Sequence, residues 1–131
     1  SASWEDYDRD GDPDLYVAND FGRNCLYQNN NGQFSNIAKK AGVEDMAAGM
    51  SVSWGDSNRD GAPDLLIGNM FSSAGQRVSF QRDYKAGKKR MARGNTLFTA
   101  SKDGFRDASI ASGITNGGWA WSSGFVAGVN A

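Results

Sequence analysis

The chain contains an internal repeat, and this repeat constrains its fold more than any single motif does. Residues 4–21 read WEDYDRDGDPDLYVANDF and residues 54–71 read WGDSNRDGAPDLLIGNMF, with ten of eighteen positions identical. The match resumes at a larger offset, where residues 24–27 (NCLY) correspond to residues 95–98 (NTLF). Offsets of 50 and 71 residues are typical of propellers and solenoids, in which each repeat is one supersecondary unit.

Each copy of the repeat predicts four short strands. One of them, residues 65–68 (LLIG), is continuously apolar, as in a strand that is covered on both faces. The expected strands of the second copy are residues 49–55, 65–68, 97–99 and 105–110. Those of the first copy are residues 15–18, 26–28 and 34–37. Because four antiparallel strands form one propeller blade, the predicted fold class is all-β.

The repeat also predicts how the chain is divided. Residues 1–43 are expected to form a first blade, truncated at its N-terminal strand, and residues 44–114 a second blade. The offset rises from 50 to 71, which predicts an insertion of 21 residues within residues 72–94. Residues 115–131 are expected to supply the first strand of a third blade. Terminal repeats need capping, so we expect a piece of a larger protein. A small domain that closes on itself is the alternative.

Composition excludes several classes of function. The chain has no His, which excludes Ser–His–Asp and Cys–His catalytic arrangements and His-ligated metal sites. Its single Cys excludes an internal disulfide and a CxxC zinc site. The formal net charge is −1, so no global field attracts nucleic acid. No apolar run approaches the length that spans a bilayer. We therefore expect no nucleic-acid partner and no membrane span.

Acidic residues are concentrated in two loops at matching places of the repeat. The windows 6–14 and 56–64 read DxDxDGxxD and DxNxDGxxD, and they hold eight of the fifteen Asp and Glu residues. Calcium binds six to eight oxygens, which alternating Asp or Asn side chains and a backbone carbonyl supply around a sharp glycine turn. The predicted ligands of two calcium sites are Asp6, Asp8, Asp10, Asp12, Asp14, Asp56, Asn58, Asp60, Ala62 and Asp64.

These loops differ from EF-hand loops. An EF-hand has a bidentate Glu at its twelfth position, which is occupied here by Val17 or Ile67 inside an apolar run. We therefore expect a calcium-bound β-turn, in which Asp14 or Asp64 supplies the closing carboxylate. An Asp-rich solvated turn without a metal is the alternative, and the recurrence of the motif in both repeats favours the metal.

Taken together, the motifs resemble the FG-GAP/VCBS repeat. The pattern is Trp-x-Asp-x-Asp/Asn-x-Asp-Gly-x-Pro-Asp-Leu, then Ala-Asn or Gly-Asn, Asn-x-Leu-Tyr/Phe, Gly-x-Phe and Ala-Gly-Val. It is similar to the integrin α-subunit propeller repeat, and especially to bacterial secreted proteins of the ASPIC/UnbV type. The resemblance implies a propeller of about seven blades, with the acidic loops binding calcium between the first and second strands of a blade. Gly128 replaces the first Asp of a third loop, so two sites are expected up to residue 131.

Three further features of the sequence are expected to have structural roles. The basic segment 77–93, with interleaved aromatics, is expected to be a solvated excursion of the blade, and docking of an acidic partner is the alternative. Trp119 and Trp121 are expected to pack in a blade core, with sugar stacking as the alternative. Cys25 is expected to be a buried, inert thiol.

The sequence thus predicts a non-enzymatic, calcium-binding propeller fragment that serves as a structural or ligand-binding module of a larger secreted protein. Metal binding explains acids that recur with the repeat better than a catalytic pair does. The expected partner is a protein, or chain segments that complete the propeller, and a glycan is left open. Scarce cytosolic calcium favours an extracellular, periplasmic or cell-surface location. The alternatives are the scaffold of a secreted enzyme and a lectin-like propeller.

Overall fold

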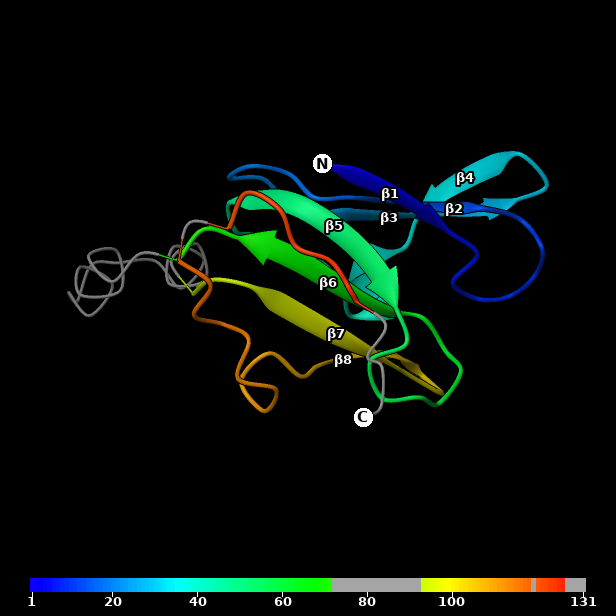
Figure 1. Ribbon diagram of the computed structural model, residues 1–131. Coiled ribbons are helices and arrows are strands. Elements are labelled where there is room, and N and C mark those ends of the chain that lie inside the picture. Colours follow the sequence, from blue (N-terminus) through cyan, green and yellow to red (C-terminus); the bar gives the residue numbers. More distant parts are fainter. Residues whose placement is uncertain (72–92, 119, 127–131) are drawn as a thin grey trace.

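The computed structural model describes residues 1–71, 93–118 and 120–126, which form two antiparallel sheets of four strands (Figure 1). The first sheet, called blade 1, contains β1 (Ala2–Glu5), β2 (Asp14–Val17), β3 (Cys25–Asn30) and β4 (Gln33–Asn36) in this order. The second sheet, called blade 2, contains β5 (Gly49–Gly55), β6 (Asp64–Asn69), β7 (Thr96–Ser101) and β8 (Gly104–Asp107) in this order. Every predicted strand of the two copies is present, so the predicted all-β fold of blade-like sheets is confirmed.

Two local details differ from the sequence expectation. β8 ends at Asp107 rather than at residue 110, because residues 109–115 form turns, and Ile110 is 77% exposed. A short helix, α1 (Ala38–Ala41), follows β4 and was not predicted. Its Ala and Lys residues favour helix, and Gly42 ends it in a left-handed conformation with φ of 79°.

No helix in the described part of the chain has the length and apolar character needed to cross a membrane.

The core lies between one face of blade 1 and one face of blade 2. Tyr16 and Leu26 face it from blade 1, and Leu65, Ile67 and Phe98 face it from blade 2. All five side chains are buried, and burial of apolar surface of this kind is the main stabilising contribution. The Tyr16 hydroxyl donates a hydrogen bond of 2.9 Å to the carbonyl of residue 43, so this buried polar group is satisfied.

The face of blade 1 that points away from the core resembles the face of blade 2 that is buried against blade 1. Trp4, Leu15 and Tyr27 are cross-strand neighbours on this face, and they correspond to Trp54, Leu65 and Phe98 of blade 2. Trp4 is 56% exposed, although its counterpart Trp54 packs against the core. Blade 1 therefore presents a partly exposed copy of a surface that is buried between the two blades.

Residues 120–126 lie against the other face of blade 2, without forming a strand (Figure 1). The Ser53 hydroxyl donates to the Ser123 carbonyl at 2.7 Å, and the hydroxyls of Ser51 and Ser123 lie 2.8 Å apart. The expectation of core packing is wrong for Trp121, which is 68% exposed, because the segment contacts blade 2 through small residues. Trp119 lies outside the described residues. Assignment of residues 115–131 to a third blade stays a prediction.

The predicted insertion, residues 72–94, lies outside the described residues apart from its last two positions. The same holds for the basic segment 77–93, of which only Arg93 is described. Phe71 and Arg93 pair in an isolated antiparallel bridge, so the described residues on either side of this segment meet beside blade 2. The predicted blade limits, residues 1–43 and 44–114, stay predictions.

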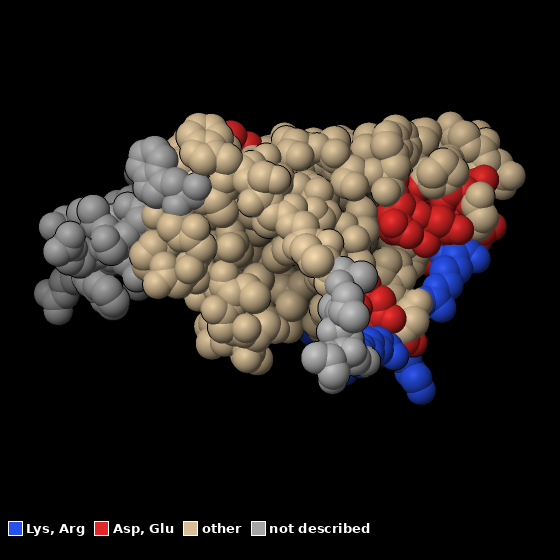
Figure 2. Space-filling view, in the orientation of Figure 1, with Lys and Arg blue, Asp and Glu red and all other residues tan. Residues whose placement is uncertain are grey.

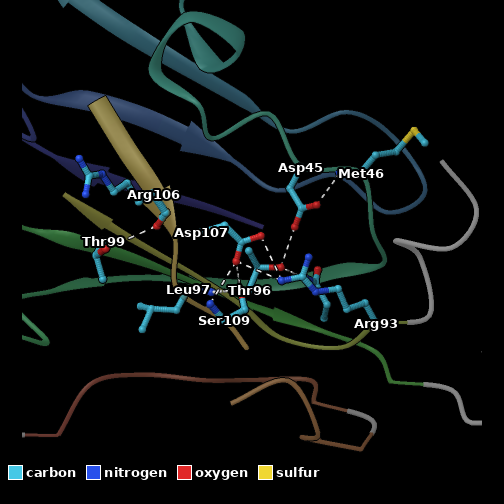
Figure 3. A network of polar contacts seen from close by, with 10 residues as sticks. Asp45, Met46, Arg93, Thr96, Leu97, Thr99, Arg106, Asp107 and Ser109 are labelled. Atoms are coloured by element: carbon cyan, nitrogen blue, oxygen red, sulfur yellow. Dashed lines mark hydrogen bonds and ion pairs between the residues drawn. The ribbon is translucent and has the colours of Figure 1, made fainter. Parts of the chain in front are cut away.

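A buried polar network ties the segment between the blades to blade 2 (Figure 3). Asp45, in this segment, is fully buried and accepts hydrogen bonds of 2.8 Å from the Met46 N–H and from the Thr96 hydroxyl of β7. The Thr96 hydroxyl also accepts a bond of 3.1 Å from the Asn69 side chain of β6. One hydroxyl therefore links the segment between the blades to two strands of blade 2.

We predict that Thr96→Val lowers the free energy of unfolding by about 1–3 kcal/mol, because it removes the hydroxyl from this buried network while keeping the side-chain volume. The matched control is Thr99→Val on the same strand, whose hydroxyl lies at the surface, 3.5 Å from the Arg106 carbonyl. This control is expected to change stability by less than about 0.5 kcal/mol. Urea unfolding of both variants measures the difference, and equal effects would contradict the role of the network.

Candidate metal centre

The two acidic loops connect the first and second strands of each blade and lie at the same end of the molecule (Figure 1). Their backbones turn at equivalent positions. Arg9 and Arg59 both have φ of 62°, and Gly11 and Gly61 have φ of 94° and 85°. The glycines were predicted from the need for a sharp turn. The left-handed arginines were not, although Arg stands at the same position of both loops.

The closing carboxylate of the first loop is the first residue of β2 and is fully buried. Asp14 accepts a hydrogen bond of 2.8 Å from the Asn29 N–H of β3 on Oδ1, and one of 3.3 Å from the Tyr7 N–H on Oδ2. Burial raises the pKa of Asp14, and the two N–H groups lower it, while the nearby Asp8 charge raises it further. Asp14 thus joins the loop to the next strand, at the cost of desolvating its charge.

The second loop has the same closure. Asp64 begins β6, is fully buried, and accepts a hydrogen bond of 2.8 Å from the Ala100 N–H of β7 on Oδ1. Its Oδ2 accepts a bond of 2.9 Å from the Ser57 N–H and a second bond from the Ser57 hydroxyl. The closing residues predicted from the sequence therefore hold equivalent places in both loops.

Three carboxylates of the first loop gather at one point. One oxygen each of Asp6, Asp8 and Asp14 lies within 4.8 Å of the others. Asp6 Oδ2 accepts a bond of 3.1 Å from the Gly11 N–H, whereas Asp6 Oδ1 is buried and has no hydrogen-bond partner. A buried carboxylate oxygen without a partner is costly unless a cation compensates its charge. The residues of the first loop therefore fit a hard cation such as calcium.

The other two acids of the first loop stabilise the turn instead. Asp10 Oδ1 accepts a hydrogen bond of 2.9 Å from the Asp12 N–H. Asp12 Oδ2 accepts one of 2.8 Å from the Asn31 N–H, in the turn between β3 and β4. Asp8 Oδ2 is held by the Gln28 side chain at 2.6 Å, a contact that the loop motif alone did not reveal. Two of the five predicted ligands are thus not part of the three-carboxylate group.

The second loop is closed by its own hydrogen bonds. The Gly61 N–H donates to Asp56 Oδ2 at 2.8 Å, and the Asn58 amide donates to Asp60 Oδ2 at 2.8 Å. The Ala62 N–H donates to Asp60 Oδ1, and this bond, followed by that from Asn58, lowers the pKa of Asp60. The described residues of this loop form no three-carboxylate group like that of the first loop.

A direct contact joins the two loops. The Arg9 guanidinium of the first loop donates a hydrogen bond to the Gly61 carbonyl of the second. Figure 2 shows the acidic side chains gathered at one end of the molecule, with basic side chains directly beside them. Arg9 occupies a variable position of the loop motif, and its contact with the second loop was not predicted, although Arg recurs at the same position as Arg59.

A comparison with protein families matches the part of the chain that holds the two loops. Residues 6–67 match the family model of the FG-GAP-like repeat. This match supports the FG-GAP assignment. It begins at the first Asp of the first loop and ends within β6, so the matched FG-GAP stretch contains both acidic loops. A search of curated proteins found no match to the chain.

We predict that Gly11→Ala and Gly61→Ala each destabilise the protein by about 1–2 kcal/mol, because a Cβ strains a left-handed backbone. A Cβ at Gly11 meets no atom within 4 Å, so the effect is one of conformation and not of a clash. The control is Gly124→Ala, where the added Cβ lies 3.8 Å from the Ser53 hydroxyl, an ordinary contact. Thermal unfolding compares the three variants, and an equal shift in all of them would count against the strained turn.

Proposed function

We propose that this protein is a calcium-binding FG-GAP module, in which each acidic loop holds one calcium ion. The observation that carries the proposal is the group formed by Asp6, Asp8 and Asp14, with a buried Asp6 oxygen that lacks a partner. Calcium prefers carboxylate and carbonyl oxygens in a flexible arrangement of six to eight ligands. The other predicted ligands, Asp10 and the backbone carbonyl of residue 12, belong to the same turn.

In this proposal, calcium strengthens the connection between each acidic loop and its blade. The closing carboxylates Asp14 and Asp64 already bind N–H groups of the third strand of each blade. A cation bound to the same carboxylates offsets their desolvation and the mutual repulsion of the neighbouring acids. Calcium would then fix each loop to its blade and stabilise the end of the molecule where both loops lie.

The first site is proposed to bind calcium more tightly than the second. The first loop carries five Asp residues, and the second carries three together with Asn58 and Ala62. Ligand charge tunes calcium affinity in such loops. The second loop also uses the Asn58 amide to hydrogen-bond Asp60, a bond that a cation must replace or accommodate.

The biological role is proposed to be that of a structural or ligand-binding module in a larger secreted protein, similar to those of the ASPIC/UnbV type and without catalytic activity of its own. Calcium sites of this kind fit an extracellular, periplasmic or cell-surface location, where calcium is plentiful. The scaffold of a secreted enzyme is the alternative from another class, because the same fold serves either role. Catalytic turnover by the intact protein would favour this alternative.

We predict that Asp8→Asn weakens calcium binding at the first site by about tenfold, and that Asn58→Asp strengthens it at the second by a similar factor. Each is measured by calorimetric calcium titration of the intact protein, with the other loop disabled by Asp60→Ala or Asp6→Ala. Asp103→Asn, in the turn between β7 and β8, is the charge-matched control and should leave both sites unchanged. The absence of calcium binding at both loops would refute the proposal, and tighter binding at the second loop would refute the charge argument.

The partly exposed face of blade 1 is proposed to be covered by another blade in the intact protein. Trp4 and Phe34, which are 56% and 48% exposed, form an edge-to-face pair on this face at 6.2 Å. Their counterparts Trp54 and Phe105 are packed against the core between the two blades. Because the two faces are built alike, the occupant that fits blade 1 is a sheet that presents residues like Tyr16 and Leu26.

Cys25 lies on this face, paired with Val17, and is the only thiol of the chain, so it reports whether the face is covered. We predict that alkylation of Cys25 in the native intact protein is much slower than in urea, because a neighbouring blade excludes the reagent. Peptide mapping after timed labelling measures the two rates, with Cys25→Ser as the blank. Equal rates in the native and unfolded protein would contradict coverage of the face.

A further inference from the structure

A pocket of about 500 Å³ opens between the two blades, at the same end as the acidic loops. Its walls come from the first loop and the end of α1 on one side, and from the turn between β7 and β8 on the other. This volume lies in the range of small-molecule sites, which favour concave positions between structural units. The metal proposal does not explain the pocket.

Two lysines line this pocket, one from each of its two sides. Lys40 lines it from α1 and Lys102 from the turn of blade 2, and neither forms an ion pair with any described residue. Arg9 also lines it, while its guanidinium is bound to the Gly61 carbonyl. Two acids also line the pocket: Asp8, which is engaged by Gln28 and belongs to the three-carboxylate group, and Asp103, next to Lys102 in the chain. Three basic side chains therefore line the pocket against two acidic ones, and the Asp8 charge is the one that a cation at the first loop would compensate, so the wall carries a net positive charge.

The same pocket has an aromatic wall. The Tyr7 and Phe105 rings, one from each blade, lie 5.9 Å apart at an angle of 40° and both line the pocket. Trp54 stacks on Tyr7 with ring centroids 6.5 Å apart, which supports the ring from behind. Aromatic side chains offer an apolar surface to a flat ligand ring. The combination of this wall with two free ammonium groups is suited to a ring that carries an acidic group.

Three of the four residues that give the pocket its chemistry do not recur with the repeat. Tyr7 corresponds to Ser57, Lys40 to Ala111 and Lys102 to Asn31, whereas Phe105 recurs as Phe34, like the Trp, Asp and Gly residues that build the blades. The scaffold of a blade therefore does not require a tyrosine or a lysine at these places. Their convergence on one pocket points to a use beyond folding.

One difference between the loops explains why the pocket is open. In the first loop, the Asp12 carboxylate reaches across to the N–H of Asn31 at 2.8 Å. The equivalent residues of blade 2 are Ala62 in the second loop and Lys102 in the turn between β7 and β8, and both line the pocket. Because Ala62 has no carboxylate, the space beside the turn of blade 2 stays open, and no acidic side chain from this position neutralises the lysine.

We propose that this pocket binds a small carboxylate-bearing ring compound, with the carboxylate between Lys40 and Lys102 and the ring against Tyr7 and Phe105. The inference rests on the proposed role as a binding module and names the class of its ligand. An acidic sugar and an aromatic acid share this chemistry, and both are used as probes.

The test is a titration of the intact protein, at saturating calcium, with glucuronate and benzoate, each compared with its neutral analogue, glucose or benzyl alcohol. We expect saturable binding of at least one acid and weaker binding of its analogue. The substitutions Lys40→Gln and Lys102→Gln should each weaken binding of the acid by about tenfold. Ala62→Asp should also weaken it, because the new carboxylate can accept a hydrogen bond from the backbone of residue 102, as Asp12 does from that of Asn31.

The matched control is Lys39→Gln, which removes the same charge from the neighbouring position of α1, outside the pocket wall. It should leave binding of the acid unchanged. Absence of binding by both acids, equal binding of the neutral analogues, or an equal loss in Lys39→Gln would overturn the inference. Calcium binding is measured separately, so a protein that binds calcium and neither acid refutes the pocket and leaves the metal proposal intact.

Discussion

The buried carboxylate at the start of the second strand of each blade is the interaction on which the rest of the structure depends. Asp14 and Asp64 each use one oxygen for the loop and the other for an N–H of the third strand. An Asn at this place has only one acceptor oxygen and could not receive one N–H on each terminal atom, and a carboxylate without these bonds would be too costly to bury. This geometry brings the acidic loop against the blade, and it leaves the remaining acids of the loop crowded together.

The two copies share a scaffold but differ in what surrounds it. The turn glycines, the closing Asp and the strand registers are equivalent in blades 1 and 2. The first loop adds Asp8 and Asp12, where the second has Asn58 and Ala62. With these substitutions the second loop forms a bond between Asn58 and Asp60, and the pocket opens beside Ala62. The blade scaffold does not depend on these two positions, so they carry different side chains, with different contacts, in the two copies.

Local patterns predicted most of the fold and the position of the acidic loops. The bounds of β5 agree with residues 49–55, because alternation and turn signals act within a few residues. Contacts between residues distant in sequence were not predicted. Arg9 binds Gly61 across 52 positions, and Gln28 binds Asp8 across 20. The burial of Trp54 and the exposure of Trp4, at equivalent positions, depend on which neighbouring sheet covers each face, a property that no local pattern contains.

The first loop lies where the proposed metal site, the second loop and the pocket meet. Asp8 belongs to the three-carboxylate group, while Tyr7 and Arg9, on either side of it, line the pocket. Because the Arg9 guanidinium also donates to the Gly61 carbonyl, a movement of the first loop would change the pocket wall and the second loop together. Compensation of the Asp6 and Asp8 charges by a cation would hold this loop in one conformation and thereby fix the aromatic wall. In the proposed function, calcium therefore preorganises the pocket without contacting the ligand, since ordering the wall beforehand lowers the entropic cost of binding.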